Sequence, residues 1–261
     1  MRFPMQIKTP NIWVRNTHDR ISAMTVIAIE GRAGSGVVDV ARVVARELDL
    51  DFVDRLLLAE IAKRVGATVE AVQDSTLRLP GRGERIIGLV QRMLERSSTG
   101  GAGRDPYFGP GVDTLIARPY AEMNDSPMTS GQELDEKHFI QTTAEVIRDV
   151  AEADNAVIVS RGAVAILRDH PDVLRVGLIA NHSDRARRIL SQLQFEDMET
   201  AEQYVSQSDT AQARYFERAF GTNPLDPFLY HVMWNLSEVS DDWAAARIID
   251  ASGALAGREL R

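Results

Sequence analysis

The sequence predicts an α/β fold in which helices cover both faces of a five-stranded parallel sheet. Three observations lead to this prediction: short β-branched runs recur along the chain, helical periodicities lie between them, and a glycine-rich turn directly follows the first run. Strands that alternate with helices are joined by right-handed crossovers, each of which lays its helix on the sheet. Strands that are buried on both faces are continuously apolar, as these runs are.

The length and composition fit one sizeable globular unit. Of the 261 residues, 44% are hydrophobic and 26% are charged, which is typical of a folded chain rather than a disordered one. We expect an N-terminal extension at residues 1–23 and a single domain at residues 24–261. The extension shows neither helical nor strand periodicity, and Met24 stands just before the first apolar run. The extension is therefore expected to be flexible and to add little stability.

Charge and cysteine content exclude several classes of function. The formal net charge of -8 opposes a broad electrostatic grip on nucleic acid or on an anionic membrane. The chain contains no cysteine, which excludes disulfides, thiolate metal sites and cysteine nucleophiles and is compatible with the cytoplasm. Its apolar runs are far shorter than the ~20 residues of a membrane-spanning helix. We expect a cytoplasmic protein without nucleic-acid or membrane partners, and the oligomeric state is left open.

The first part of the domain opens with the clearest strand of the chain. Thr25–Ile29 is short, rich in β-branched residues and almost wholly apolar, and we expect it at the centre of the sheet. Apolar or small residues at three- and four-residue spacing then predict a helix over Val37–Asp49. Asp51–Asp54 has the pattern of a second strand, and further helices are expected at Arg55–Val65 and Glu84–Arg96.

The second part resumes the alternation after a long irregular segment. Residues 97–133 collect glycines and prolines without a period, and their number favours a functional loop or an insertion over an ordinary connection. A helix is expected around Phe139–Val150, followed by three strands separated by helices. These strands are predicted at Ala156–Val159, Leu174–Ile179 and near Tyr230–Asn235. The segment Asn181–Ser183 is expected to supply the N-cap of a basic helix that follows the second of them.

A phosphate-binding loop is indicated between the first strand and the first helix. The segment has the first half of such a motif, G-x-x-x-x-G, in the context that the motif requires. Glycines let consecutive backbone N–H groups converge on one point, and the helix N-terminus adds its partial positive charge. The expected phosphate-binding residues are Gly31, Arg32, Ala33, Gly34, Ser35 and Gly36. The alternative interpretation is a glycine-rich turn without a ligand.

The second half of the motif is missing. Val37 and Val38 stand where lysine and then serine or threonine would follow, so the cation for the terminal phosphates and the magnesium-binding hydroxyl are both absent. Arg32, or arginines from other elements, would have to restore the positive charge. Asp39 and Ser35 are candidate substitutes for the hydroxyl, but the pattern predicts no metal site.

Further segments form a common pattern with the glycine loop. The matching segments are Val26–Gly36, Asp51–Arg55, Val157–Gly162, His170–Ala180, Ser183–Arg188, Asp209–Tyr215, Phe220–Gly221 and Tyr230–Asn235. Together they resemble the phosphate loop, the later strands and the arginine-bearing lid of the cytidylate kinase-like family, a branch of the P-loop nucleoside monophosphate kinases. The resemblance extends from about Met24 to Ala251 and leaves residues 97–133 poorly matched.

The resemblance implies a three-layer, P-loop kinase-like fold with lid and monophosphate-binding insertions. It also implies transfer of phosphate from ATP to a pyrimidine nucleoside monophosphate such as CMP, with Mg²⁺. Two departures from the family pattern are visible. Cytidylate kinases have an Arg-Asp pair after the third strand, whereas this chain has Arg161 and then Gly162. His231 stands where the branch usually carries an acid.

Arginines and one carboxylate complete the expected site. Arg185 and Arg188 are three residues apart and share a helix face, so that two guanidinium groups can meet one polyphosphate. Arg161 and Asp54 follow or end predicted strands, at the sheet edge where open α/β folds bind ligands, and are the expected substrate-binding residues. The expected catalytic groups are these three arginines and Arg214, which the resemblance places near the phosphates.

Two hypotheses of function follow. In the first, ATP binds on the glycine loop, a monophosphate binds near Asp54 and Arg161, and the lid arginines neutralise the transferring group. Catalysis would then consist of positioning and electrostatic stabilisation. In the second, the two valines indicate a kinase-derived nucleotide-binding or regulatory protein without turnover. Nucleotides are the expected small-molecule partners in both, and ATP and Mg²⁺ are the expected cofactors of the first.

Overall fold

The computed structural model describes residues 25–55, 130–153, 155–159 and 162–256. Within these ranges five parallel strands form one sheet in the order β2-β3-β1-β4-β5. The central strand β1 (Val26–Gly31) pairs with β3 (Ala156–Val159) on one side and β4 (Val173–Ile179) on the other. The edges are β2 (Asp51–Asp54) and β5 (Val232–Asn235). The predicted five-stranded parallel sheet and the central place of its first strand are confirmed.

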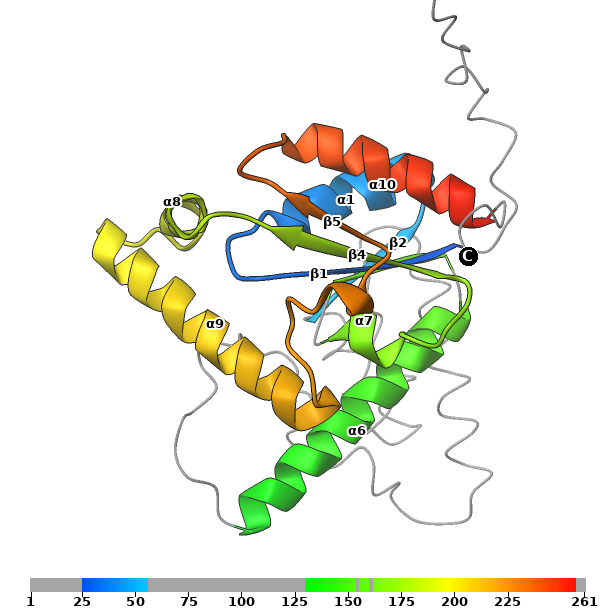
Figure 1. The fold of residues 1–261 in the computed structure, drawn as a ribbon, viewed down its shortest axis with the longest axis horizontal. Helices are drawn as coiled ribbons and strands as arrows, with labels where there is room; N and C mark the ends of the chain where they lie inside the picture. The colour runs from blue at the N-terminus through cyan, green and yellow to red at the C-terminus, as the bar shows by residue number, and fades with distance from the viewer. Residues whose placement is uncertain (1–24, 56–129, 154, 160–161, 257–261) are drawn as a thin grey trace, which may run out of the picture.

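Helices cover both faces of the sheet and give the fold three layers (Figure 1). One face is covered by α1 (Val37–Leu48) and α10 (Asp241–Ala256). The other face is covered by α6 (Ser130–Ala153), α7 (Ala163–Ile166) and α9 (Met198–Phe220). Helix α8 (His182–Leu193) lies beyond the carboxyl ends of the strands, at the same end of the sheet as the turn from β1 to α1.

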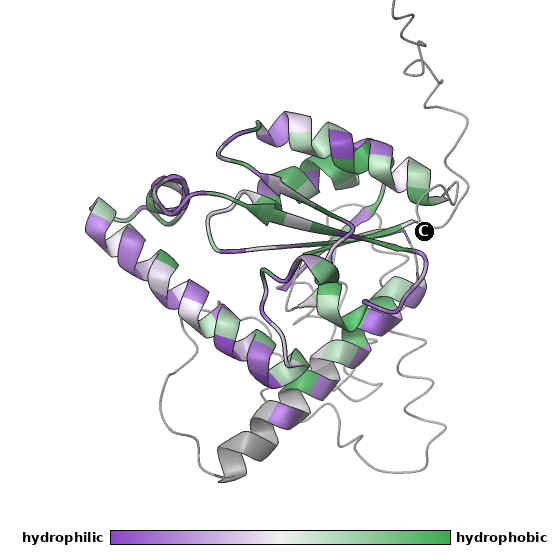
Figure 2. Cartoon of the chain, viewed as in Figure 1, coloured by the Kyte–Doolittle hydropathy of each residue, from purple (hydrophilic) through white to green (hydrophobic). Residues whose placement is uncertain are grey.

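The alternation of side chains along β1 explains why the core has two halves. Val26 and Ala28 belong to the cluster on the side of α6, α7 and α9, whereas Ile27 and Ile29 belong to the cluster beneath α1 and α10. All four side chains are buried. An uninterrupted apolar run is what a strand needs when both of its faces are covered. Figure 2 shows the strands as the hydrophobic centre, with hydrophilic residues on the outer sides of the helices.

Several boundaries differ from the prediction. Helix α6 begins at Ser130, so the last residues of the predicted irregular segment 97–133 are helical. Gly131 lies in the first turn, where a helix lacks intrahelical partners for its N–H groups in any case. Strand β5 begins at Val232 rather than near Tyr230, because a 3₁₀ helix at Pro227–Leu229 precedes it and the Tyr230 N–H donates to the Pro227 carbonyl.

The N-terminus of α8 also differs in detail from the prediction. Asn181 is the N-cap residue, as expected, but its side chain makes no capping hydrogen bond. Its backbone N–H instead donates to Ser237 Oγ at 2.8 Å, which ties the start of α8 to the segment after β5. The predicted extension at 1–23, the helix predicted at Arg55–Val65 beyond its first residue, the helix predicted at 84–96, and residues 97–129 lie outside the described residues.

Candidate functional site

The turn between β1 and α1 has the backbone of an anion-binding loop. Gly34 and Gly36 have φ angles of 77° and 83°, a region that glycine adopts without strain. The Ser35 N–H donates to the Arg32 carbonyl at 3.0 Å and closes the turn. Gly36 is the N-cap of α1, and no side chain among the described residues caps this helix end. The first N–H groups of α1 are therefore available to an anion.

Helix α8 packs directly on this loop. A Cβ atom at Gly34 would lie 2.4 Å from the carbonyl oxygen of Arg185, and one at Gly36 would lie 2.1 Å from Nη1 of Arg188. The first contact is with backbone and the second with a guanidinium group, so glycine is required at Gly34 by the helix itself. The two arginines that the sequence predicts on one helix face thus both lie against the loop.

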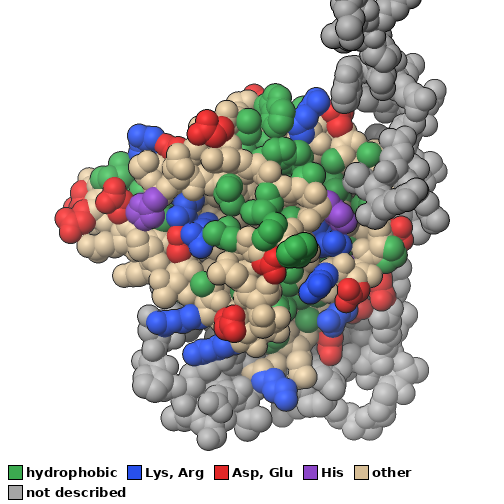
Figure 3. Space-filling model, viewed as in Figure 1, with side chains coloured by type: hydrophobic (Ala, Val, Ile, Leu, Met, Phe, Trp, Pro, Cys, Tyr) green, Lys and Arg blue, Asp and Glu red, His purple; other side chains and the backbone are tan. Residues whose placement is uncertain are grey.

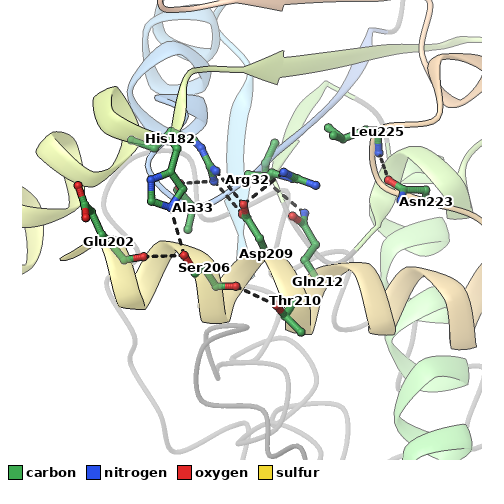
Figure 4. A network of polar contacts seen from close by, with 12 residues as sticks. Arg32, Ala33, His182, Glu202, Ser206, Asp209, Thr210, Gln212, Asn223 and Leu225 are labelled. Carbon is green, nitrogen blue, oxygen red and sulfur yellow. Dashed lines mark hydrogen bonds and ion pairs between the residues drawn. The ribbon is translucent and has the colours of Figure 1, made fainter. Parts of the chain in front are cut away.

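A single carboxylate on α9 joins two of the predicted arginines. Nη1 and Nη2 of Arg185 donate to the two Asp209 oxygens at 2.7 Å each, and Arg185 is only 3% exposed. Nη1 of Arg32 donates to the same carboxylate at 3.2 Å. Nη1 of Arg185 also donates to the Ala33 carbonyl at 3.3 Å. Asp209 therefore holds the loop, α8 and α9 together, and Figure 4 shows it pointing from α9 toward Arg32.

Arg188 is held at a different place. Its Nη2 donates to Asp241 Oδ1, in the first turn of α10, at 2.8 Å. Its Nη1, beside Gly36, is buried and has no hydrogen-bond partner within the described residues. Arg185 and Arg188 thus meet different carboxylates although they share a helix face.

A buried carboxylate lies beneath the loop. Glu30 precedes the last residue of β1 and is buried. It accepts hydrogen bonds from the Gly162 N–H at 2.9 Å and from Gln212 Nε2 at 3.0 Å. Gln212 Nε2 also donates to the Gly31 carbonyl at 3.3 Å. These bonds tie the start of the loop to the turn after β3 and to α9.

A small depression lies beside the loop, between the ends of β1 and β4. Glu30, Arg32 and Gln212 form its polar side, and Leu178 and Tyr230 lie on its apolar side. Burial, with the nearby charge of Glu30, raises the pKa of the Tyr230 hydroxyl, so this group stays protonated. The depression has no enclosed space even for a water molecule, whereas pockets for small-molecule ligands usually measure about 300–1,000 Å³. It therefore cannot hold a nucleotide by itself.

The described residues at the loop do not fit a magnesium ion. Val38 offers no oxygen atom, and Asp39 Oδ2 accepts a hydrogen bond from Gln192 Nε2 at 3.3 Å on the surface. Both oxygens of Glu30 are engaged. In the part of the chain that the structure describes, no three His, Asp or Glu side chains are grouped as metal ligands. Ser35 carries a hydroxyl group within the loop, and its buried Oγ has no hydrogen-bond partner among the described residues.

The remaining predicted residues are spread along the carboxyl edge of the sheet and on α9. Asp54 ends β2 and is paired in register with Val159 of β3, so that one strand separates it from β1. Arg214 is exposed on α9. Arg161 lies outside the described residues. The structure thus brings the glycine loop, Arg185 and Arg188 together, whereas Arg214 does not join them in a buried cluster.

Four polar residues next to the loop were not among the predicted site residues: Asp209, Gln212, Asp241 and Glu30. Of these four, Glu30 could have been inferred from the sequence. It is a carboxylate at the end of an otherwise apolar strand run, and a buried carboxylate requires hydrogen-bond partners. Asp209 and Asp241 look like ordinary helix-surface acids in the sequence, because their partners come from other helices.

The surface shows no broad field of one charge on the face drawn in Figure 3, where basic and acidic side chains are interspersed. None of the helices that the structure describes is long and apolar enough to cross a membrane. Phe228, at the 3₁₀ helix before β5, is the most exposed of the large hydrophobic side chains in the described ranges, at 83%.

Comparison with known proteins agrees with this architecture. The family model described as the cytidylate kinase-like family matches residues 26–238, from β1 through the loop and α8 to just beyond β5. No curated protein matches the chain in sequence. Three similar solved structures are an uncharacterized protein from Eubacterium ventriosum ATCC 27560, shikimate kinase from Bacteroides thetaiotaomicron and a gluconokinase from Sinorhizobium meliloti 1021.

These structures differ in how closely they match. The Eubacterium protein has a TM-score of 0.56 and 17% identity, over 87% of this chain and 98% of its own. The shikimate kinase has a TM-score of 0.44 and 16% identity, over 91% of this chain and 100% of its own. The gluconokinase has a TM-score of 0.38 and 13% identity, over 90% of this chain and 92% of its own. The first of these likenesses shows a shared fold. Because the family model spans the whole sheet and the glycine loop, the chain belongs to the cytidylate kinase-like family.

Proposed function

We propose that this protein transfers a phosphoryl group from ATP to a nucleoside monophosphate of the CMP type. The observation that carries the proposal is the glycine loop, with Gly34 and Gly36 at positive φ and the uncapped N-terminus of α1 behind them. This arrangement lies at the carboxyl end of the central strand, where open α/β sheets bind ligands. Membership of the cytidylate kinase-like family supports both the donor and the class of acceptor.

In this proposal the chain acts by positioning and by electrostatic stabilisation. The backbone N–H groups at the start of α1 bind the phosphates of ATP, and Arg188 adds a positive charge beside Gly36. Asp54 and Arg161 bind the monophosphate, and Arg214 contributes charge from α9. Phosphoryl transfer demands little covalent chemistry from a protein, so these groups are of the right kind for it.

A nucleotide-binding protein without turnover is the second candidate, and the two valines at positions 37 and 38 favour it. Val38 gives no metal-binding oxygen, and Val37 gives no cation. One well-placed cation at a transferring phosphate is worth about 10³ to 10⁵ in rate. In the arrangement described, Arg32 and Arg185 are both directed to Asp209, which offsets one of their two positive charges.

A product assay paired with a binding assay separates the two candidates. The natural chain and the Val37→Lys, Val38→Ser variant are incubated with ATP, Mg²⁺ and a panel of nucleoside monophosphates. The kinase proposal expects CMP-dependent ADP formation that Gly36→Val abolishes and that the restored loop accelerates. ATP binding without product from either protein would favour the second candidate. Absence of ATP binding to the natural chain would contradict both.

A further inference from the structure

The Arg188 guanidinium extends from α8 to the N-terminal end of α1. A Cβ atom on Gly36 would lie 2.1 Å from Nη1 and 3.1 Å from Cζ, so the guanidinium directly covers the N-cap of α1. Nη1 is buried and unpartnered within the described residues. A buried N–H group without an acceptor is unfavourable and rare in folded proteins.

The charges at this point also favour an anion. The N-terminus of α1 carries partial positive charge, and no described side chain caps it. Asp39 in its first turn offsets part of this charge, and Asp241 is the counter-charge of Arg188. An anion placed between the loop N–H groups and Nη1 would satisfy the buried donor and add a second counter-charge.

The other arginines near the loop have different surroundings. Asp209 binds Arg185 through two hydrogen bonds and Arg32 through one, so both guanidinium groups are directed to this carboxylate, which offsets one of their two positive charges. Arg214 is exposed on α9. Arg188 is thus the arginine whose guanidinium lies over the N-cap glycine in the part of the chain that the structure describes.

We propose that Arg188 supplies, from α8, the positive charge that a lysine at position 37 supplies in a complete loop, and that Asp241 positions it. Asp241 Oδ1 accepts from Nη2 at 2.8 Å, which leaves Nη1 at Gly36. The Val37 side chain is buried toward Gly31 and carries no charge of its own. The ligand class is a phosphate or polyphosphate group. The inference rests on the proposed function in one respect, that the loop binds phosphate.

The test is calorimetric titration of the full chain with inorganic tripolyphosphate, which has neither base nor ribose. Arg188→Gln is expected to weaken binding by about 10- to 100-fold, as for a lost hydrogen bond to a charged group. The matched control is Arg187→Gln, which removes the same charge from the same helix at an exposed residue paired with Asp184. It is expected to change Kd by less than about twofold.

Rescue distinguishes a binding role from a structural one. Adding Val37→Lys to Arg188→Gln should recover most of the lost affinity, although it cannot rebuild the bond to Asp241. Asp241→Asn is compared with Asp242→Asn, its exposed neighbour in the same helical turn, so that the change in net charge is equal. Asp241→Asn should bind at least about threefold more weakly than this control, and the difference should vanish in the Arg188→Gln background.

Each outcome has a defined meaning. Thermal unfolding without ligand checks the fold of every variant, and Arg188→Met, which keeps the apolar stem, replaces Arg188→Gln if the latter is unfolded. Equal effects of the Arg188 and Arg187 variants, no rescue by Val37→Lys, or equal Kd values for the two aspartate variants would overturn the inference and leave the proposed function standing. If the natural chain binds neither tripolyphosphate nor ATP, the inference and the proposed function both fail.

Discussion

Replacing Asp209 by asparagine is expected to destabilise the protein strongly, because this carboxylate serves two arginines. It accepts two hydrogen bonds of 2.7 Å from Arg185 and one of 3.2 Å from Arg32. The Arg185 side chain is 4% exposed, so its charge would remain buried without a counter-charge. Breaking a buried ion pair on one side costs about 3–5 kcal/mol. The 17% exposure of the Asp209 side chain admits some water, which favours the lower end, about 3 kcal/mol.

The assay is thermal unfolding followed by circular dichroism. In a domain of this size, about 3 kcal/mol corresponds to a fall in Tm of roughly 6–12 °C. The matched control is Glu47→Gln, which removes an ion pair between exposed groups on α1 and should leave Tm nearly unchanged. If both variants have the same Tm as the natural chain, the carboxylate does not hold the loop to α8 and α9, and the reasoning fails.

Three further predictions follow from the loop and from β5. Gly34→Ala should lower Tm more than Gly36→Ala, because its Cβ would meet the backbone of Arg185 and not a movable side chain; equal Tm values would contradict this. Phosphate binding measured by calorimetry should be the same in EDTA as in Mg²⁺, and a requirement for Mg²⁺ would place a metal ligand outside the described residues. Burial, with the charge of Arg175, lowers the pKa of His231. The unfolded chain therefore takes up the proton first, and stability present above about pH 6.5 should be lost as the pH falls toward the folded-state pKa. His231→Asn should flatten this pH dependence of Tm, and an unchanged slope would assign it to another group.

The fold could be predicted well because its signals are local. Within the run Thr25–Ile29, the residues from Val26 onward include no polar position that could face solvent, and this alone favours a central strand. The glycine spacing indicates a tight turn for a similar reason, since Gly34 and Gly36 have the positive φ angles that other residues avoid. Boundaries were less determined, as at α6, where Gly131 is compatible with both a loop and a helix start.

The candidate site could be predicted only in part, because its contacts are between helices. The spacing of Arg185 and Arg188 shows that they share a face, but it does not show which acid each one meets. Their partners, Asp209 and Asp241, come from α9 and α10, whose placement depends on the packing of the whole sheet. A pattern along one helix contains no information about a carboxylate that arrives from another.

The hydrogen bond between Glu30 and Gln212 has a consequence for biosynthesis. The two residues are 182 positions apart in the chain, and translation proceeds at about 5–20 residues per second. Roughly 10–40 s therefore pass between the emergence of the carboxylate and that of its amide partner. During this interval the end of β1 has to keep Glu30 in water or in contact with a chaperone, because burying it without this partner is costly. The central strand is among the first to be synthesised, yet its loop end is completed only after α9 has left the ribosome.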